Sequence, residues 1–165
     1  MGSDLTLPVD QGLVNLRVGA IILKDGKILM VGNDRHDYDY SVGGRIRFGE
    51  TAEDAVLREV EEETGVRMEI DRLGFIEENF FYGDSEYNRD QLVYELSFYF
   101  YMKVPPDFEP RCCSFTEDGI RERLEWLSPD TEKKIYPGFF RTELERPVPW
   151  VRHIVTDDRG ETEDI

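Results

Sequence analysis

Three glutamates in the middle of the chain, Glu59, Glu62 and Glu63, have the spacing of one helical face. At about 100° per residue, the i, i+3, i+4 pattern places their carboxylates on a single stripe. Like charges at this spacing repel by roughly 0.2–0.5 kcal/mol per pair, and a helix C-terminus disfavours anions further. A hard divalent cation such as Mg²⁺ or Mn²⁺ would reverse these effects. The pattern therefore indicates a metal-binding stripe, the alternative being a glutamate-rich face that is simply solvated.

Glycines and arginines just before this stripe favour the metal-binding interpretation. Gly43 and Gly44 permit tight backbone turns, and Arg45 and Arg47 bring positive charge close to the carboxylates. Arg58 can reach an acidic residue one turn away and orient its carboxylate. Because the whole chain is strongly acidic, a local group of cations of this kind is where we expect a phosphate to bind.

The helix that carries the stripe has clear boundaries, with Thr51 as N-cap, Asp54 in the capping-box position and Gly65 as the stop. Strand-like runs on both sides supply the sheet that must hold it. We expect strands at residues 13–23, 27–31, 68–82, 91–102 and 124–127, a hairpin turn at residues 24–27, an exposed loop at residues 32–40, a glycine-rich turn from residue 43 into the helix, and short helices from residues 128 and 137.

A longer motif runs from Gly44 to Val66. Gly44 is followed after five residues by Glu50, and after seven more by the run Arg58-Glu59-Val60-Glu61-Glu62-Glu63-Thr64-Gly65-Val66. Every fixed position matches the signature of the Nudix hydrolase family, which the chain resembles. The strands before the motif, the aromatic strands after it and the segment Glu125 to Pro129 also look like this family, so the resemblance covers residues 14–155.

The resemblance implies an α/β fold, namely a Nudix-type α/β/α sandwich around a mixed β-sheet. It also implies that four oxygen donors hold the metal: the carboxylates of Glu59, Glu62 and Glu63 and the carbonyl of Gly43. Glu50 and Arg58 would brace the loop and the helix behind these ligands. The implied reaction is substitution at phosphorus by water, assisted by Mg²⁺ (or Mn²⁺) and by a carboxylate acting as general base.

The general base is open at this stage. Glu59 is one candidate, but relatives often use a carboxylate from a distant loop. Residues 115–126 offer Glu117, Asp118, Glu122 and Glu125. We favour Glu122, which lies shortly before Trp126, and Glu77 and Glu78 come next; the alternative is that all of them are surface charges. We expect His36 and His153 to be surface or packing residues.

Small features outside the signature indicate the class of substrate. Relatives that act on ADP-ribose often carry a proline past the signature, where this chain has Phe80-Phe81-Tyr82, whereas diadenosine polyphosphate enzymes often carry a tyrosine there. Arg45 and Arg47 are expected to bind phosphates and Tyr82 the base, with Tyr38, Tyr40 and Phe80 as other stacking candidates. Tyr82 could equally be a strand aromatic that packs the sheet.

These features favour a nucleoside triphosphate or a dinucleoside polyphosphate as the substrate of a Mg²⁺-dependent pyrophosphohydrolase. Three alternatives stay open. One is an ADP-ribose or nucleotide-sugar pyrophosphatase. Another is a non-catalytic module that binds a nucleotide, although such modules usually lose signature glutamates. The third is an acidic interaction protein that matches the motif by chance.

The composition limits the remaining possibilities. With 165 residues the chain fits one domain, which we expect at residues 1–155, followed by an acidic, disordered tail at residues 156–165. A net charge of −16 argues against bulk nucleic acid and anionic membranes as partners. Residues 1–10 do not resemble a leader peptide, and Cys112 and Cys113 are expected to be reduced thiols, so we expect a cytoplasmic protein. Monomer and homodimer remain equally open.

Overall fold

The computed structural model describes residues 2–111 and 119–160. Cys112, Cys113, Glu117 and Asp118, which the sequence singled out, lie outside the described residues. The helices are α1 (Ala52–Thr64) and the short α2 (Phe140–Glu143). The strands are β1 (Thr6–Val9), β2 (Gly12–Ile21), β3 (Leu23–Lys24), β4 (Lys27–Asn33), β5 (Tyr38–Arg45), β6 (Glu69–Tyr82), β7 (Leu92–Lys103), β8 (Glu122–Leu127), β9 (Lys134–Tyr136) and β10 (Arg152–Asp157).

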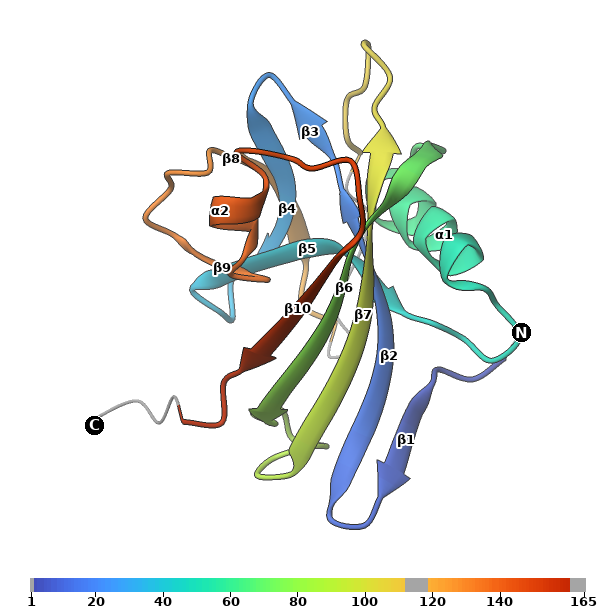
Figure 1. Ribbon diagram of the computed structural model, residues 1–165, viewed down its shortest axis with the longest axis vertical. Coiled ribbons are helices and arrows are strands. Elements are labelled where there is room, and N and C mark those ends of the chain that lie inside the picture. Colours follow the sequence, from blue (N-terminus) through green and yellow to red (C-terminus); the bar gives the residue numbers. More distant parts are fainter. Residues whose placement is uncertain (1, 112–118, 161–165) are drawn as a thin grey trace.

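The strands form one mixed sheet, with the order β10-β6-β7-β2-β5-β4-β3 (Figure 1). Beside this path, β1 pairs with β2, β8 with β4 and β9 with β5. The pairs β2–β7, β5–β9 and β6–β10 are parallel, and the others are antiparallel. The expected mixed β-sheet is therefore confirmed.

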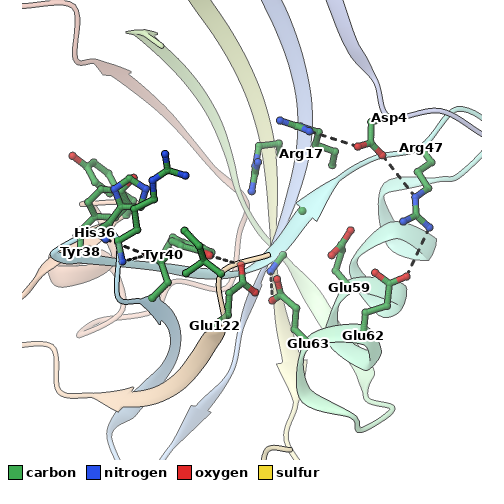
Figure 2. Close-up of a pocket in the computed structure, with 17 residues that line it drawn as sticks. Asp4, Arg17, His36, Tyr38, Tyr40, Arg47, Glu59, Glu62, Glu63 and Glu122 are labelled. Atoms are coloured by element: carbon green, nitrogen blue, oxygen red, sulfur yellow. Dashed lines mark hydrogen bonds and ion pairs between the residues drawn. The ribbon is translucent and has the colours of Figure 1, made fainter. Parts of the chain in front are cut away.

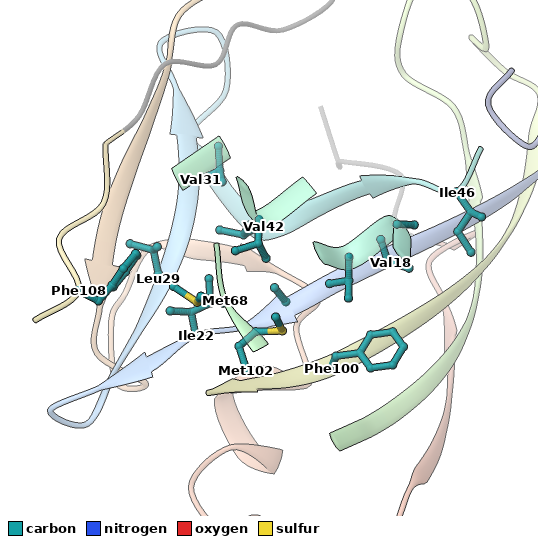
Figure 3. Close-up of a cluster of buried hydrophobic side chains, with 14 residues drawn as sticks. Val18, Ile22, Leu29, Val31, Val42, Ile46, Met68, Phe100, Met102 and Phe108 are labelled. Carbon is teal, nitrogen blue, oxygen red and sulfur yellow. The ribbon is translucent and has the colours of Figure 1, made fainter. Parts of the chain in front are cut away.

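Alternating side chains build a separate apolar core on each face of the sheet. On β7, Phe100 and Met102 join the core that contains the buried face of α1, whereas Tyr99 and Tyr101 join the core that contains Phe140 of α2. Figure 3 shows the first of these cores, where β2, β4, β5 and β7 contribute side chains. The sheet thus lies between the two helices, α2 being only a single short turn.

Helix α1 has the boundaries that the sequence predicts. The Thr51 hydroxyl accepts a hydrogen bond from the Asp54 amide at 3.0 Å, and the Asp54 carboxylate accepts one from the Thr51 amide at 3.4 Å. Gly65 ends the helix in the left-handed conformation, with φ of 72°. Because Ala55, Val56 and Val60 face the core, α1 has a fixed rotation about its axis.

The expected loop at residues 32–40 is confined to residues 34–37, and the expected turn at Gly43-Gly44 is wrong. Strand β4 extends to Asn33 and β5 begins at Tyr38, so residues 34–37 alone separate the two strands. Asp39 is fully buried, and its carboxylate lies 2.8 Å from the Lys133 ammonium. The alternating Tyr and Asp residues have the period of a strand, which their polarity concealed.

Other elements differ at the edges of the sheet. A short helix from residue 128 is wrong, because turns occupy that segment, whereas the short helix expected from residue 137 is present as α2. Strand β10 was not predicted; it pairs with β6 and includes Thr156 and Asp157, so the expected tail does not begin at residue 156. Neither helix of the described residues has the length and apolar character needed to cross a membrane.

The capping interaction gives a direct test of the α1 boundary. We expect Thr51→Ala to lower the free energy of unfolding by about 1 kcal/mol, because the Asp54 amide loses its acceptor. Thr51→Ser keeps the hydroxyl and should stay within about 0.5 kcal/mol of the unmodified protein. Denaturant titration measures both values. Equal stability of Thr51→Ala and Thr51→Ser would contradict this assignment.

Candidate active site

A cavity of about 620 Å³ lies where β5 passes the C-terminal half of α1 (Figure 2). One side of it carries the α1 glutamates, with Arg47 beside Glu62, and the opposite side carries His36, Tyr38 and Tyr40. The lining residues are Asp4, Arg17, Asn33, Arg35, His36, Tyr38, Tyr40, Gly43, Gly44, Arg45, Arg47, Glu59, Glu62, Glu63, Ile120, Glu122 and Tyr136. The structure thus brings together most of the site residues that the sequence predicts.

The three glutamates of α1 differ strongly in exposure. The side chain of Glu62 is 49% exposed and that of Glu59 is 13% exposed, whereas Glu63 is buried and only 8% exposed. The Gly43 amide donates a hydrogen bond to Glu63 at 3.1 Å. The predicted stripe therefore runs from the protein surface into the interior and ends against the backbone of β5.

Two glycines allow β5 to pack closely against both α1 and β2. A Cβ at Gly44 would lie 2.5 Å from the Glu59 carboxyl carbon, and a Cβ at Gly43 would lie 2.1 Å from the Val18 carbonyl oxygen. Both distances are far too short for real atoms. The glycines are therefore needed for close approach within a strand, and not for the turn that the sequence suggested.

Arg58 joins the segment before α1 to the glutamate stripe. Its guanidinium donates to Glu50 at 2.6 and 2.9 Å, to Glu59 at 2.5 Å and to Glu62 at 3.4 Å, and also to the Arg45 carbonyl at 3.1 Å. The hydrogen bonds from Arg58 lower the pKa of Glu50 to about 2. Glu50 does not line the cavity but holds Arg58 from behind, and its second oxygen accepts from the Arg47 amide at 2.9 Å.

The deepest carboxylate is poorly stabilised by its surroundings. Burial raises the pKa of Glu63 well above its usual range, and the negative charges of Glu59 and Glu122 raise it further. Burial also raises the pKa of Glu59, although its contact with Arg58 acts in the opposite direction. Arg17 on β2 contributes positive charge to both. Ionising Glu63 in this cavity therefore costs free energy unless a further cation is present.

The donor set fits a hard divalent cation. Glu59, Glu62, Glu63 and Gly43 line one cavity and supply oxygen donors, which Mg²⁺ and Mn²⁺ prefer. Among the described residues, no three Asp, Glu, His or Cys side chains already converge on one point, because Glu59 and Glu62 turn toward Arg58. Holding a cation there requires these two carboxylates to share or exchange their arginine contacts.

Glu122 at the start of β8 faces the stripe from the opposite wall. It is buried, with an exposed fraction of 8%, and accepts a hydrogen bond from the Tyr40 hydroxyl at 2.6 Å (Figure 2). Burial and this hydrogen bond raise the pKa of Tyr40 above its usual range. The Tyr40 hydroxyl therefore stays a proton donor and fixes one Glu122 oxygen.

The other carboxylates that we considered as general bases lie elsewhere. Glu125 is bound by Lys133 at 2.8 Å and by Arg123 at 2.6 Å. Glu77 points into a different cavity, and Glu78 contacts His153 at 2.6 Å. None of these three lines the cavity of the stripe.

The predicted phosphate-binding arginines both line the cavity. The Arg47 guanidinium lies 3.8 Å from Glu62 and 3.7 Å from Asp4, and that of Arg45 lies 3.6 Å from Asp4. Tyr82, the predicted base-binding residue, does not line the cavity and is 54% exposed near the end of β6.

The cavity is lined by Tyr38, which was a predicted stacking candidate, by His36, which was expected to be a surface or packing residue, and by Tyr136, which the sequence analysis missed. His36 stacks on Tyr38 with ring centroids 4.8 Å apart, and Tyr136 meets Tyr38 edge-on at 5.1 Å. These rings form an aromatic wall opposite the glutamates. Arg17 was also missed; a charged residue inside an otherwise apolar strand was the available signal, whereas Tyr136 has no local signal at all.

Comparison with known proteins places this arrangement in a family. Residues 14–156 match the NUDIX domain profile, which covers most of the chain. The chain therefore belongs to the NUDIX family and is a Nudix hydrolase family enzyme. Members of this family are typically dependent on a divalent metal and act on nucleotide-type small molecules.

Individual relatives are more distant. A "MutT-like protein" of Streptomyces ambofaciens is 36% identical over 61 residues, which is 37% of this chain and 40% of that protein. The match thus spans less than half of the relative's length.

Solved structures show the same fold. The MutT protein of Methanosarcina mazei Go1 has a TM-score of 0.59 at 17% identity, covering 81% of this chain and 91% of that one. The MutT protein of Bacillus halodurans has a TM-score of 0.58 at 18% identity, covering 84% and 89%. An ADP-ribose pyrophosphatase of Streptococcus suis has a TM-score of 0.51 at 20% identity, covering 86% and 98%.

The two glycines of β5 make a matched pair of test positions. We expect Gly43→Ala to destabilise the fold strongly, because its Cβ would meet the backbone of β2. Gly44→Ala should instead lower the melting temperature only slightly, because its Cβ meets the movable Glu59 carboxylate. Turnover should nevertheless fall by at least about tenfold, the consequence of a misplaced active-site group. Near-native turnover of Gly44→Ala, measured beside its melting curve, would be inconsistent with a role of Glu59.

Glu63 gives a pH-dependent prediction. Its unfolded carboxyl ionises near pH 4.3, whereas its folded pKa is raised, so ionisation destabilises the folded protein above that pH. In metal-free buffer at pH 7 we expect Glu63→Gln to melt at a higher temperature than the unmodified protein. The difference should shrink as the pH falls to about 4. Mg²⁺ should raise the melting temperature of the unmodified protein but not that of Glu63→Gln.

The control for this prediction is Glu62→Gln, since the Glu62 side chain is half exposed and should change the metal-free melting temperature little. We also expect Glu63→Gln to have no measurable turnover. A lower melting temperature for Glu63→Gln than for the unmodified protein, in metal-free buffer at pH 7, would rule out this account of the buried carboxylate.

Proposed function

We propose that the protein is a Mg²⁺-dependent pyrophosphohydrolase that cleaves a phosphoanhydride bond in a nucleoside diphosphate derivative. The observation that carries this proposal is the composition of one cavity. An acidic stripe that needs a cation, two arginines beside it, and a buried carboxylate on the opposite wall all face the same space. This combination suits a substrate that brings several negative charges and requires an activated water molecule.

In this proposal Glu59, Glu62, Glu63 and the Gly43 carbonyl hold the metal. When bound, Mg²⁺ lowers the pKa of water and neutralises the charge on the phosphates. Arg45 and Arg47 bind the phosphate oxygens and orient the chain across the cavity. Glu50 and Arg58 keep the stripe in position from behind.

Glu122 is the proposed general base. It takes a proton from the attacking water while a new bond forms between the water oxygen and phosphorus. The P–O bond to the leaving phosphate breaks, and its electron pair stays on the leaving oxygen. Tyr40 donates to one oxygen of Glu122 and so orients this carboxylate for the proton transfer.

For the substrate we favour a nucleoside triphosphate or a dinucleoside polyphosphate over ADP-ribose. Arg45 and Arg47 beside the stripe suit a phosphate chain, and the wall of His36, Tyr38 and Tyr136 suits stacking of a flat ring. Tyr82 gives this preference no structural support, since it lies outside the cavity. A relative of the same fold is named as an ADP-ribose pyrophosphatase, so ADP-ribose belongs in any test.

The proposed function is tested by a turnover panel at fixed Mg²⁺. The panel contains nucleoside triphosphates, dinucleoside polyphosphates, ADP-ribose and nucleotide sugars, with product nucleotides separated by chromatography. We expect Mg²⁺-dependent hydrolysis that is lost in Glu62→Gln/Glu63→Gln. Full activity of this double variant would exclude the metal assignment, and a roughly tenfold preference for ADP-ribose, about 1.4 kcal/mol, would reverse the substrate ranking.

The general base has its own test. We expect Glu122→Gln to lower kcat by about 10²- to 10⁴-fold, because the water loses its proton acceptor. The stabilisation by Mg²⁺ should persist, since Glu122 is not one of the proposed metal ligands. Glu125→Gln, in the same strand but bound by Lys133 and Arg123, is the matched control and should keep kcat within about threefold. An unchanged kcat for Glu122→Gln would remove Glu122 from the mechanism.

A further inference from the structure

A second cavity of about 450 Å³ lies on the face of the sheet that α2 covers. Its floor is formed by β2, β6 and β7, and its cover by the segment from Lys134 to Phe139. Arg17, Tyr40 and Tyr136 line this cavity and the cavity of the stripe as well. The two spaces are therefore adjacent, with these three side chains between them.

The floor of this second cavity is polar where a covered sheet face should be apolar. Glu77 on β6 pairs with Ser97 on β7, and Asn79 pairs with Glu95, so the four side chains share one face. Two residues further along β7, Tyr99 on the same face joins the apolar core. Glu77 and Ser97 are 4% and 2% exposed. Burying such groups costs stability, which a binding function accounts for.

These groups are mainly acceptors with unused capacity. Glu77 accepts from Thr156 at 2.8 Å and from the Tyr99 hydroxyl at 3.2 Å, but a carboxylate has about four acceptor sites. The side-chain oxygen of Asn79 is buried and has no hydrogen-bond partner within the described part of the chain. Glu95 faces the same space, with the Arg17 guanidinium 4.0 Å away. The floor is therefore suited to a ligand that donates hydrogen bonds.

We propose that this second cavity binds the nucleobase of the substrate and selects a base with adjacent N–H donors, as on the N1–H and N2–H₂ edge of guanine. The inference rests on the proposed function for the identity of the ligand. Among the common bases, guanine alone presents two neighbouring donors to one carboxylate. Glu77 is the acceptor of this pair, and Asn79 accepts from the remaining amine hydrogen.

Charge and shape agree with a base and argue against another phosphate. The acidic residues Glu77, Glu95 and Asp158 line the second cavity together with the cations Arg17 and Lys134, so its lining has a net negative charge that disfavours an anionic group. The rings of Tyr136 and Phe139 belong to its wall and offer surfaces for stacking. The cavity volume lies within the range of about 300–1,000 Å³ that is typical of small-molecule sites. The phosphates then extend past Arg17 to the stripe.

The test compares guanine with hypoxanthine, which lacks only the exocyclic amine. GMP and IMP are titrated into the protein by calorimetry in the presence of Mg²⁺, and kcat/KM is measured for GTP, ITP and ATP. We expect GMP to bind at least about tenfold more tightly than IMP, as for a lost hydrogen bond to a charged group. In Glu77→Gln this ratio should fall to about 1.

Glu78→Gln is the matched control, because it makes the same change one residue along β6, on the other face, and should keep the preference. Asn79→Ala is a second variant for the case that Glu77→Gln does not fold, and it should reduce the preference too. Equal binding of GMP and IMP by the unmodified protein, or a preference that survives in the floor variants, overturns the proposal. Calorimetry needs no turnover, so guanine-selective binding without hydrolysis would refute the proposed function alone.

Discussion

The close approach of β5 to α1 is the constraint on which the site depends. Where Gly43 and Gly44 pass the helix, no side chain separates the strand from the glutamates, and the Gly43 amide bonds directly to Glu63. A Cβ at Gly44 would lie against the Glu59 carboxylate and a Cβ at Gly43 against β2, so β5 can take this position only with glycine at both. The apolar face of α1 fixes the other partner, since Val56 and Val60 are fully buried. Strand and helix are thus positioned before any ligand binds.

This contact has an electrostatic cost that the arginines offset in part. Arg58 contacts three carboxylates, of which Glu50 lies outside the cavity, so most of its charge serves to hold α1 and the preceding segment together. Arg17 reaches the site from β2 and influences both Glu59 and Glu63. The remaining imbalance is concentrated on Glu63. A site that is strained in this way gains more from a cation than a solvated one, because the screening by water is weak there.

Local patterns in the sequence were sufficient for α1, its caps and the stripe, since these depend on residues a few positions apart. They failed at β5, where tyrosines, aspartates and glycines conceal a strand whose stability comes from its neighbours β2, β4 and β9. Glu122 could be favoured by its place before Trp126, but its meeting with Tyr40 joins residues 82 positions apart. Tyr82 was predicted to bind the base because relatives carry a tyrosine at this place in the sequence. Such a match does not say which cavity the side chain reaches, and Tyr82 does not line the active-site cavity.

Side chains alternate along β6 and β7, so the groups that line the second cavity are separated by the thickness of the sheet from the core beneath α1. Glu77 and Asn79 lie on the face turned away from α1, whereas Glu95 is linked to the stripe through Arg17. Substitutions at Glu77 and Asn79 can therefore change what this face binds without altering the packing of α1. A scaffold of this kind can acquire new substrates through changes at a few positions of the second cavity. Its hydrolytic centre can stay the same while this happens.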